Sequence, residues 1–270
     1  MSSLLDQLRV EPGKGAALND RDPGARLGAK DKPAGVERLG KLVERLGVLH
    51  DRLYAEATRA VLLVLQGMDA AGKDGVIRTV LTGVNPQGCR VESFKAPSPD
   101  ELAHDFLWRV HARCPRRGEI GIFNRSHYED VVVVRVHELV PENVWGKRYA
   151  HITAFEELLT SEGTTVVKVF LHESKDAQRE RLQARLDDPE KRWKFRSGDL
   201  DDRAKWDAFQ VAYADAIEKT STKHAPWYVV PADHNWSRNL CVAEILVDAL
   251  ERLDPVLPEP MPGIEQLKIS

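Results

Sequence analysis

The spacing of apolar residues changes along the chain between a helical period and short continuous runs. From residue 36 to residue 57 apolar side chains recur every three or four positions, which predicts an amphipathic helix. The recurring positions are Val36, Leu39, Leu42, Leu46, Leu49 and Leu53. Residues 61–66 then form a nearly unbroken apolar run, VLLVLQ, with the length of a buried strand.

Strands and helices alternate over the rest of the chain. Apolar runs predict five strands, at 61–66, 89–94, 119–123, 166–171 and 227–230. Helices are expected from the end of the glycine-rich turn at 67–72 to Val84, and at about 99–114, 145–159, 176–186, 202–219 and 237–253. The run VVVV at 131–134 fits either a strand or a helix. The pattern predicts an α/β fold, a doubly wound parallel five-stranded sheet with helices on both faces.

One large domain accounts for this alternation. Residues 1–34 are rich in Gly, Pro, Asp and Lys, and we expect an N-terminal arm that lies on the body or on a neighbouring subunit. The domain itself is expected over 35–255, with a mobile, charged helical lid at about 186–202. Residues 256–270 form a C-terminal tail.

Composition narrows the class of protein. The chain has 270 residues, 42% of them hydrophobic, which is enough for one large core. The net charge of −3 gives no general attraction for nucleic acid. The three scattered cysteines fit a reducing compartment, and no apolar run approaches the ~20 residues that span a bilayer. We therefore expect a soluble cytoplasmic protein, a homo-oligomer without nucleic-acid or membrane partners.

The most specific motif follows the first strand. Residues 67–73 read GMDAAGK, the G-x-x-x-x-G-K spacing of a loop that binds phosphate through backbone N–H groups and a lysine. The alternative is a glycine-rich turn with a surface lysine and no ligand. A strand before the turn and a helix after it favour phosphate binding. The expected phosphate-binding residues are Gly67, Ala70, Ala71, Gly72, Lys73, Asp74 and Gly75. The carboxylate of Asp74 itself is best explained as a partner of the helix dipole.

Carboxylates beside this loop suggest a metal ion. Asp74 occupies the position where the motif has a magnesium-binding Ser or Thr, and Asp69 lies inside the loop. Because bare carboxylates would repel phosphate, we expect Asp69 to bind Mg²⁺. The third strand leads to FNRSHYED, in which Asp130 is the best second metal ligand, with a helix N-cap as its alternative. Arg125 is placed to bind phosphate rather than to form a surface ion pair.

Basic residues gather in a second region, after the fourth strand. Arg181 and Arg185 share one helix face, and KRWKF at 191–195 alternates cations with aromatic residues. An arginine-bearing helix followed by a charged loop resembles the lid of nucleoside monophosphate kinases, which closes over transferring phosphates. The expected lid cations are Lys191, Arg192 and Lys194. A solvated helix face is the alternative, and for Arg179 and Arg181 it is equally good.

Taken together, these stretches resemble the polyphosphate kinase family 2. The matching segments are GMDAAGKDG, SFKAPS followed by ELAHDFLWR, FNRSHYEDV, RLDDPEKRWKF, GDL and APWYVVPAD, between about residues 36 and 253. The family resembles thymidylate kinases in fold and moves phosphate between inorganic polyphosphate and nucleotides with Mg²⁺. The combination is far more specific than the phosphate loop alone.

The resemblance implies roles for individual residues. Asp69 and Asp130 would bind metal, and Lys73 and Arg125 the transferring phosphates. Glu129 resembles the class III subgroup, which accepts both AMP and ADP. Lys95 and Arg185 match positions near the substrate, so the expected nucleotide-binding residues are Lys95, Arg125, Glu129 and Arg185. The implied activity is reversible transfer between polyphosphate and adenine nucleotides (AMP, ADP, ATP).

Two other functions fit parts of the pattern. An ATP-dependent nucleoside or nucleotide kinase of thymidylate-kinase type would share the loop and the lid, because residue spacing does not identify the phosphate donor. A nucleotide-binding regulatory module without chemistry would share the loop alone, and the basic lid argues against it.

Overall fold

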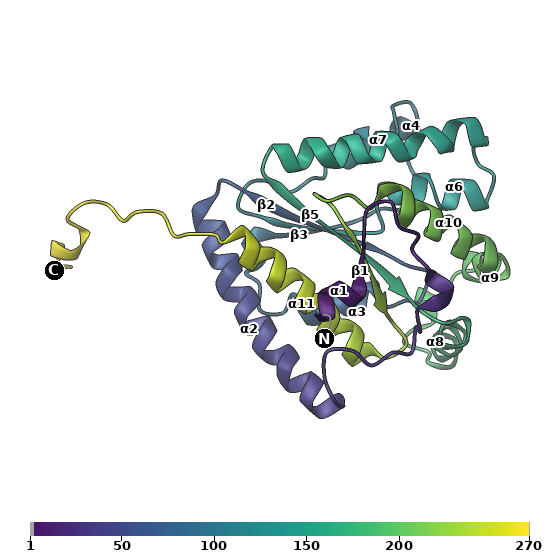
Figure 1. Cartoon of the computed structure of the whole chain (residues 1–270), viewed down its shortest axis with the longest axis horizontal. Coiled ribbons are helices and arrows are strands. Elements are labelled where there is room, and N and C mark those ends of the chain that lie inside the picture. The colour runs from purple at the N-terminus through teal and green to yellow at the C-terminus, as the bar shows by residue number, and fades with distance from the viewer. Residues whose placement is uncertain (1–2, 270) are drawn as a thin grey trace.

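A six-stranded sheet crosses the molecule, with helices on both of its faces (Figure 1). We describe residues 3–269 of a computed structural model. The strands are β1 (Arg9–Val10), β2 (Ala60–Gln66), β3 (Cys89–Ser93), β4 (Ile120–Asn124), β5 (Thr164–His172) and β6 (Trp227–Pro231). Their order is β1-β6-β5-β2-β4-β3, and every pair from β6 to β3 is parallel. The α/β class and the five predicted strands are confirmed.

The prediction of a five-stranded, all-parallel sheet is wrong by one strand. β1 pairs antiparallel with β6, with Arg9 opposite Tyr228 and Val10 opposite Trp227. Two residues are too few for a hydrophobic period, so no sequence pattern marks this strand. It forms because Leu8 and Val10 are buried against the body, one on each side of the sheet.

The helices cover the sheet in two layers. Their bounds are α1 (Leu4–Leu8), α2 (Lys32–Glu56), α3 (Lys73–Val80), α4 (Pro99–Leu102), α5 (Trp108–His111), α6 (Val133–Val136), α7 (Glu142–Ser161), α8 (Lys175–Asp187), α9 (Gly198–Ala204), α10 (Trp206–Thr220) and α11 (Asn235–Leu253). In Figure 1, α2 and α11 lie on one side of the strands, and α7 and α10 on the other. The valine run resolves as a helix, since α6 contains its second half.

The single helix expected over 99–114 is two short helices, α4 and α5. Ser98 begins α4 with a capping box, in which its hydroxyl accepts from Glu101 N–H and the Glu101 carboxylate accepts from Ser98 N–H. After α4 the side chain of Asp105 accepts a hydrogen bond from the backbone N–H of Leu107 at 2.9 Å. Such a local bond competes with the helical pattern, which accounts for the break.

The core shows why β2 reads as an unbroken apolar run. Val61, Leu63 and Leu65 face the layer of α2, α3 and α11, whereas Leu62 and Val64 face the layer of α7 and α10. Successive side chains of a strand point to opposite faces, and here both faces are covered, so every position from Ala60 to Leu65 is apolar. The strand is thereby fixed in the middle of the sheet, with its carboxyl end beside those of β4 and β5.

The two ends of the chain differ in their packing. Arg21 ties the N-terminal residues together by donating to the carbonyls of Gln7, at 2.8 Å, and of Ala16, at 3.1 Å. The C-terminal residues after α11 extend away from the body in Figure 1. The division into an arm at 1–34, a domain at 35–255 and a tail at 256–270 stays a prediction. Within residues 3–269, none of the helices combines the length and the apolar character that a membrane span needs.

Candidate active site

The turn at 67–72 joins β2 to the start of α3 and determines where the site lies. Ala70 (φ 74°) and Gly72 (φ 96°) adopt left-handed backbone conformations. At Gly72 a Cβ atom would overlap the guanidinium of Arg238, so both the conformation and the close packing require glycine. The turn therefore leads directly into a helix N-terminus, where free N–H groups favour an anion.

Lys73 is the first residue of α3 and is folded back over the turn. Its Nζ donates to the carbonyls of Gly67, at 2.7 Å, and Met68, at 3.1 Å. Burial and the nearby charge of Arg125 lower the pKa of Lys73 from its ordinary value. The structure thus places a desolvated ammonium group beside the amide-lined turn, where an anion would gain most from it.

Arg125 links the turn to the segment that follows β4. Its Nη2 forms an ion pair with Asp69 Oδ1, and its Nη1 donates to Glu129 Oε2 at 3.3 Å. The two acids raise the pKa of Arg125, Glu129 more strongly than Asp69. Arg125 has a φ of 62°, an unfavourable conformation for a residue with a Cβ atom. Such a conformation is typical of functional sites, where surrounding contacts hold it.

The two acids on Arg125 have different protonation tendencies. Burial acts against the charge of Asp69, but Arg125 and Lys73 outweigh it and hold its pKa below the ordinary value. For Glu129 burial dominates, and its pKa is raised in spite of Arg125 and Lys73. Asp69 is therefore the stable anion of the pair. The surroundings thus favour the charged form more strongly at Asp69 than at Glu129.

Asp130 lies on the other side of this segment, with different partners. Arg148 donates to its Oδ1 at 3.2 Å and to its backbone oxygen at 2.9 Å, and Arg109 lies 3.9 Å from Oδ2. Arg109 also donates to the carbonyl of Lys95 at 2.8 Å. Burial raises the pKa of Asp130. The structure thus joins Asp69 to Arg125 and Glu129, and Asp130 to Arg109 and Arg148. A shared metal-binding role for Asp69 and Asp130 stays a prediction.

Asp74 lies at the rim of the site. It is exposed in the first turn of α3 and accepts a hydrogen bond from the side-chain amide of Asn124 at 2.8 Å. An acid in the first turn interacts favourably with the helix dipole. This contact also ties the start of α3 to the end of β4.

Three residues that the motifs do not identify donate hydrogen bonds to the backbone carbonyls of the turn. Arg238 on α11 is buried and donates to the carbonyl of Ala71 at 3.1 Å, and burial lowers its pKa to about 10. Gln178 on α8 donates to the carbonyl of Asp69 at 3.0 Å. Arg181 donates to the carbonyl of Ala70 at 3.3 Å. Arg181 was visible as part of a basic helix, but no local signal marks Arg238.

Glu173, just after β5, is a second buried acid beside the turn. Its Oε2 accepts from Arg181 at 3.0 Å, whereas its Oε1 is buried without a hydrogen-bond partner. Burial raises the pKa of Glu173 to about 8, although Arg181 and Lys73 oppose the shift. The folded protein therefore holds a proton on Glu173 at pH values where the unfolded chain has lost it.

This proton makes stability depend on pH. The contribution of Glu173 is fully present below pH 4.5 and is lost as the pH rises through about 8. As the pH rises from 4.5 to about 8, the free energy of unfolding of Glu173→Gln should increase relative to that of the wild type, by at most about 1.4 kcal/mol per pH unit. Urea unfolding of the wild type and of Glu173→Gln at pH 5 and pH 8 measures this difference in stability. Glu180→Gln, which changes an exposed acid on α8, is the control. A difference that does not change with pH would contradict the expectation.

The lid segment, residues 186–202, carries three cations that pack on its own residues. Lys191 donates to Asp188 at 2.6 Å, Arg192 to the carbonyl of Leu186 at 2.7 Å, and Lys194 lies over the ring of Trp193. These three cations are exposed, and the contacts just given all lie within the lid segment. The lid segment therefore offers positive charge to solvent.

Arg185 and Asp199 connect the lid segment to the site. Arg185 lies 3.5 Å from the carboxylate of Asp199, and its charge also lowers the pKa of Asp69. Asp199 is buried, and burial together with the charge of Asp69 raises its pKa. Sequence reasoning singled out Arg185 but not Asp199, which lies in the GDL segment.

Two surface hollows lie away from these residues. One, of about 400 Å³, is lined by the outer face of α8, and the other, of about 520 Å³, by residues 135–145. Neither is lined by the turn. We place the site by its chemistry rather than by these hollows, because a backbone turn at a helix N-terminus binds anions without an enclosed cavity.

The chain is similar to known proteins both in sequence and in fold. The family model described as polyphosphate kinase 2 (PPK2) matches residues 29–257. An AMP/ADP-polyphosphate phosphotransferase of Meiothermus ruber is 55% identical over 267 residues, which are 98% of this chain and 100% of the relative. An ADP-polyphosphate phosphotransferase of Rhodopseudomonas palustris is 50% identical over 239 residues, 84% of this chain and 83% of the relative. The crystal structure of polyphosphate kinase 2 from Arthrobacter aurescens TC1 superposes with a TM-score of 0.94 at 43% identity, covering 98% of this chain and 95% of that one.

Proposed function

The chain belongs to the polyphosphate kinase 2 family, and on this basis we propose that it transfers phosphate from inorganic polyphosphate to AMP and to ADP. The observation that carries the proposal is the match, over 98% of this chain, to a relative named for both acceptors. The geometry supports it, since an anion-binding turn, Lys73 and Arg125 meet at one edge of the sheet.

The turn acts as the phosphate loop of a P-loop kinase. The backbone N–H groups from Gly67 to Gly75 bind phosphate oxygens, and Lys73 exchanges its bonds to the Gly67 and Met68 carbonyls for phosphate. Arg238, Gln178 and Arg181 hold the carbonyl side of the turn, so its N–H groups stay oriented. An electrostatic site of this kind works best when its dipoles are fixed before the reaction.

Transfer is in line and forms no covalent enzyme intermediate. A phosphate oxygen of AMP or ADP attacks the terminal phosphorus of polyphosphate, and the P–O bond to the rest of the chain breaks. The shortened polyphosphate leaves, and the reaction is reversible. Arg125 binds the transferring group and neutralises charge that develops on its oxygens.

The protein donors fit Mg²⁺ only in combination with phosphates. Within residues 3–269, no group of three or more His, Cys, Asp or Glu side chains could hold a metal. Mg²⁺ commonly takes one or two carboxylates and fills its other positions with phosphate oxygens and water. Asp69, ionised and at the turn, and Asp130 would be these carboxylates. When bound, the metal would neutralise phosphate charge.

The lid segment would supply the remaining positive charge. Lys191, Arg192 and Lys194 are exposed and would exchange their contacts within the lid segment for a bound polyanion, and closure would exclude water. Lys95, Arg125, Glu129 and Arg185 would contact the nucleotide. A homo-oligomeric state, a cytoplasmic location and ATP as a product stay predictions.

The donor decides between this function and an ATP-dependent nucleotide kinase. Purified protein is incubated with AMP, Mg²⁺ and polyphosphate in the absence of ATP, and ADP and ATP are measured by chromatography. We expect both products to form. Conversion of AMP only when ATP is supplied would favour a kinase of the thymidylate-kinase type, and no conversion with either donor would favour a regulatory module.

Glu129 is expected to influence the choice between AMP and ADP. Its carboxyl group contacts Arg125 and is largely buried, so its charge, when the group is ionised, acts in a poorly screened site. ADP carries more phosphate charge than AMP, and Glu129→Asn should therefore shift the ratio of kcat/KM values toward ADP by roughly threefold to tenfold. Initial rates with each acceptor measure the ratio, with Glu157→Gln, exposed on α7, as the control. An unchanged ratio would remove Glu129 from acceptor selection.

A further inference from the structure

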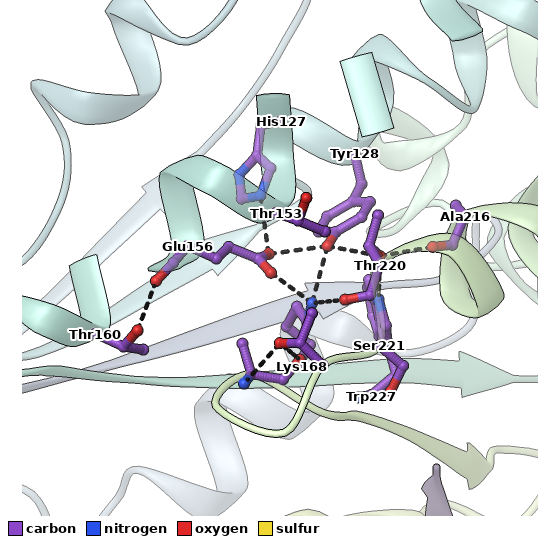
Figure 2. Close-up of polar contacts among 12 residues, drawn as sticks. His127, Tyr128, Thr153, Glu156, Thr160, Lys168, Ala216, Thr220, Ser221 and Trp227 are labelled. Atoms are coloured by element: carbon purple, nitrogen blue, oxygen red, sulfur yellow. Dashed lines mark hydrogen bonds and ion pairs between the residues drawn. The ribbon is translucent and has the colours of Figure 1, made fainter. Parts of the chain in front are cut away.

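A buried ion pair contacts the segment that carries Arg125, Glu129 and Asp130, on its buried side. Glu156 on α7 and Lys168 on β5 are both fully buried, and Glu156 Oε2 accepts from Lys168 Nζ at 2.5 Å. Figure 2 shows the pair among side chains that come from separate elements of the fold. We call Glu156, Lys168, His127, Tyr128 and Thr220 the buried network.

Lys168 uses all three of its N–H donors within this network. Besides Glu156, it donates to the hydroxyl of Tyr128 at 3.1 Å and to the backbone oxygen of Thr220 at 2.7 Å. These three bonds join α7, β5, α10 and the segment after β4 (Figure 2). The ammonium group is thereby fixed from three directions.

Glu156 joins the network to the segment after β4. Its Oε1 accepts from the Tyr128 hydroxyl at 2.8 Å and lies 3.3 Å from His127 Nε2. Burial opposes the charge of Glu156, yet the adjacent Lys168 keeps its pKa below the ordinary value. The carboxylate is therefore ionised and makes charge-assisted bonds to two consecutive residues of that segment.

The segment 125–130 presents two sides. His127 and Tyr128 are buried and point into the network, as Figure 2 shows. Arg125, Glu129 and Asp130, which flank them, contact the groups of the candidate active site instead. A displacement of His127 or Tyr128 would move these three residues, because His127–Asp130 is one short 3₁₀ turn and only its N-cap, Ser126, separates it from Arg125.

Stability alone is a poor explanation for this ion pair. Removing two charges from water costs more than their attraction commonly returns, and apolar replacements of buried pairs are often neutral or stabilising. A buried pair with saturated hydrogen bonds can instead fix one arrangement of the elements that it joins.

We propose that Glu156 and Lys168 are positioning residues that hold the segment 125–130 in its geometry for phosphate transfer. They act through Tyr128 and His127 and do not touch the substrate. This inference rests on the proposed function for its kinetic consequences, but its structural consequence is independent of that function.

The test is the double variant Glu156→Gln with Lys168→Met, which removes both charges together. We expect a thermal midpoint equal to or above that of the wild type, a kcat that is ~10- to 100-fold lower, and polyphosphate binding within about threefold of the wild type. Hydrogen exchange of the peptide covering 124–132 should become faster. The control, Glu56→Gln with Arg59→Met, removes a paired acid and base at the opposite end of β2.

The single variants separate positioning from stability. Lys168→Met alone leaves a buried, unpaired carboxylate and should lower both stability and kcat. A merely structural role predicts that the double variant recovers kcat together with stability, whereas positioning predicts recovery of stability only. If the double variant fails to fold, Tyr128→Phe is the alternative test. It keeps the aromatic ring, removes the connecting hydroxyl, and should lower kcat about tenfold.

Each outcome has a definite meaning. Wild-type kcat in a stable double variant, or unchanged exchange at 124–132, overturns the proposal. If the wild type shows no transfer from polyphosphate, the proposed function fails, and the exchange measurement alone decides whether the network holds the segment. Faster exchange confined to 124–132 supports it in that case too.

Discussion

Replacement of Asp69 by asparagine is expected to lower kcat for phosphate transfer by ~10²- to 10³-fold. The substitution keeps size and shape but removes the only acid of the turn at 67–72. In the structure this carboxylate is ionised because Arg125 and Lys73 outweigh its burial. A neutral amide can neither attract a cation to the bound phosphates nor orient Arg125 by charge.

The loss should fall on turnover more than on binding. Charge neutralisation matters most in the transition state, where it affects kcat, whereas the backbone N–H groups and Lys73 still hold the ground state. Kinetics with varied polyphosphate and a direct binding measurement separate the two. Asp176→Asn, an exposed acid at the start of α8, is the matched control. Equal losses in affinity and turnover would contradict a metal-linked role for Asp69.

Replacement of Lys73 by methionine is expected to lower kcat/KM by ~10²- to 10⁴-fold while leaving stability unchanged or higher. A charge-assisted bond to a transferring phosphate contributes several kcal/mol in a desolvated site, which corresponds to such factors. Lys73 is 7% exposed, and burial lowers its pKa, so the folded state bears a desolvation cost that methionine does not. Opposite changes in activity and stability are typical of functional residues.

Steady-state kinetics and thermal unfolding, measured on the same preparation, test the expected loss of activity and the expected change in stability. Lys41→Met removes an exposed lysine of α2 that pairs with Glu37 and is the control for loss of one charge. Loss of stability in parallel with activity would instead mean that the bonds from Nζ to Gly67 and Met68 are mainly structural. Activity within threefold of the wild type would exclude Lys73 from phosphate transfer.

The comparison of sequence and structure shows which signals are local. The strand β2 and the turn after it could be predicted because each depends on neighbouring residues, an apolar run in one case and glycine spacing in the other. The division of the 99–114 segment into two helices could not be predicted, because a single hydrogen bond from the Leu107 N–H to the Asp105 side chain outweighs the helical period. The strand β1 was missed since only its pairing with β6 defines it.

In the candidate site, too, some features could be predicted from local sequence and others could not. Residue type and spacing identified Asp69, Lys73 and Arg125, which the structure brings together. Spacing did not reveal that Asp130 faces Arg109 and Arg148 instead, because the direction of a side chain depends on the packing of α5 and α7. A carboxylate can be recognised in a sequence, but its partners are set by elements that are far away along the chain.

The sequence by itself determined the α/β class, the glycine-rich turn after the first strand and the resemblance to polyphosphate kinases, because these depend on local periodicity and on residues within one motif. Only the tertiary structure decided what holds the turn and the segment 125–130 in place. Arg238 reaches Ala71 across 167 positions, and Lys168 reaches the Thr220 carbonyl across 52. Burial and charge act through space, so contacts of this kind, and the pKa shifts that follow from them, arise only when the chain has folded.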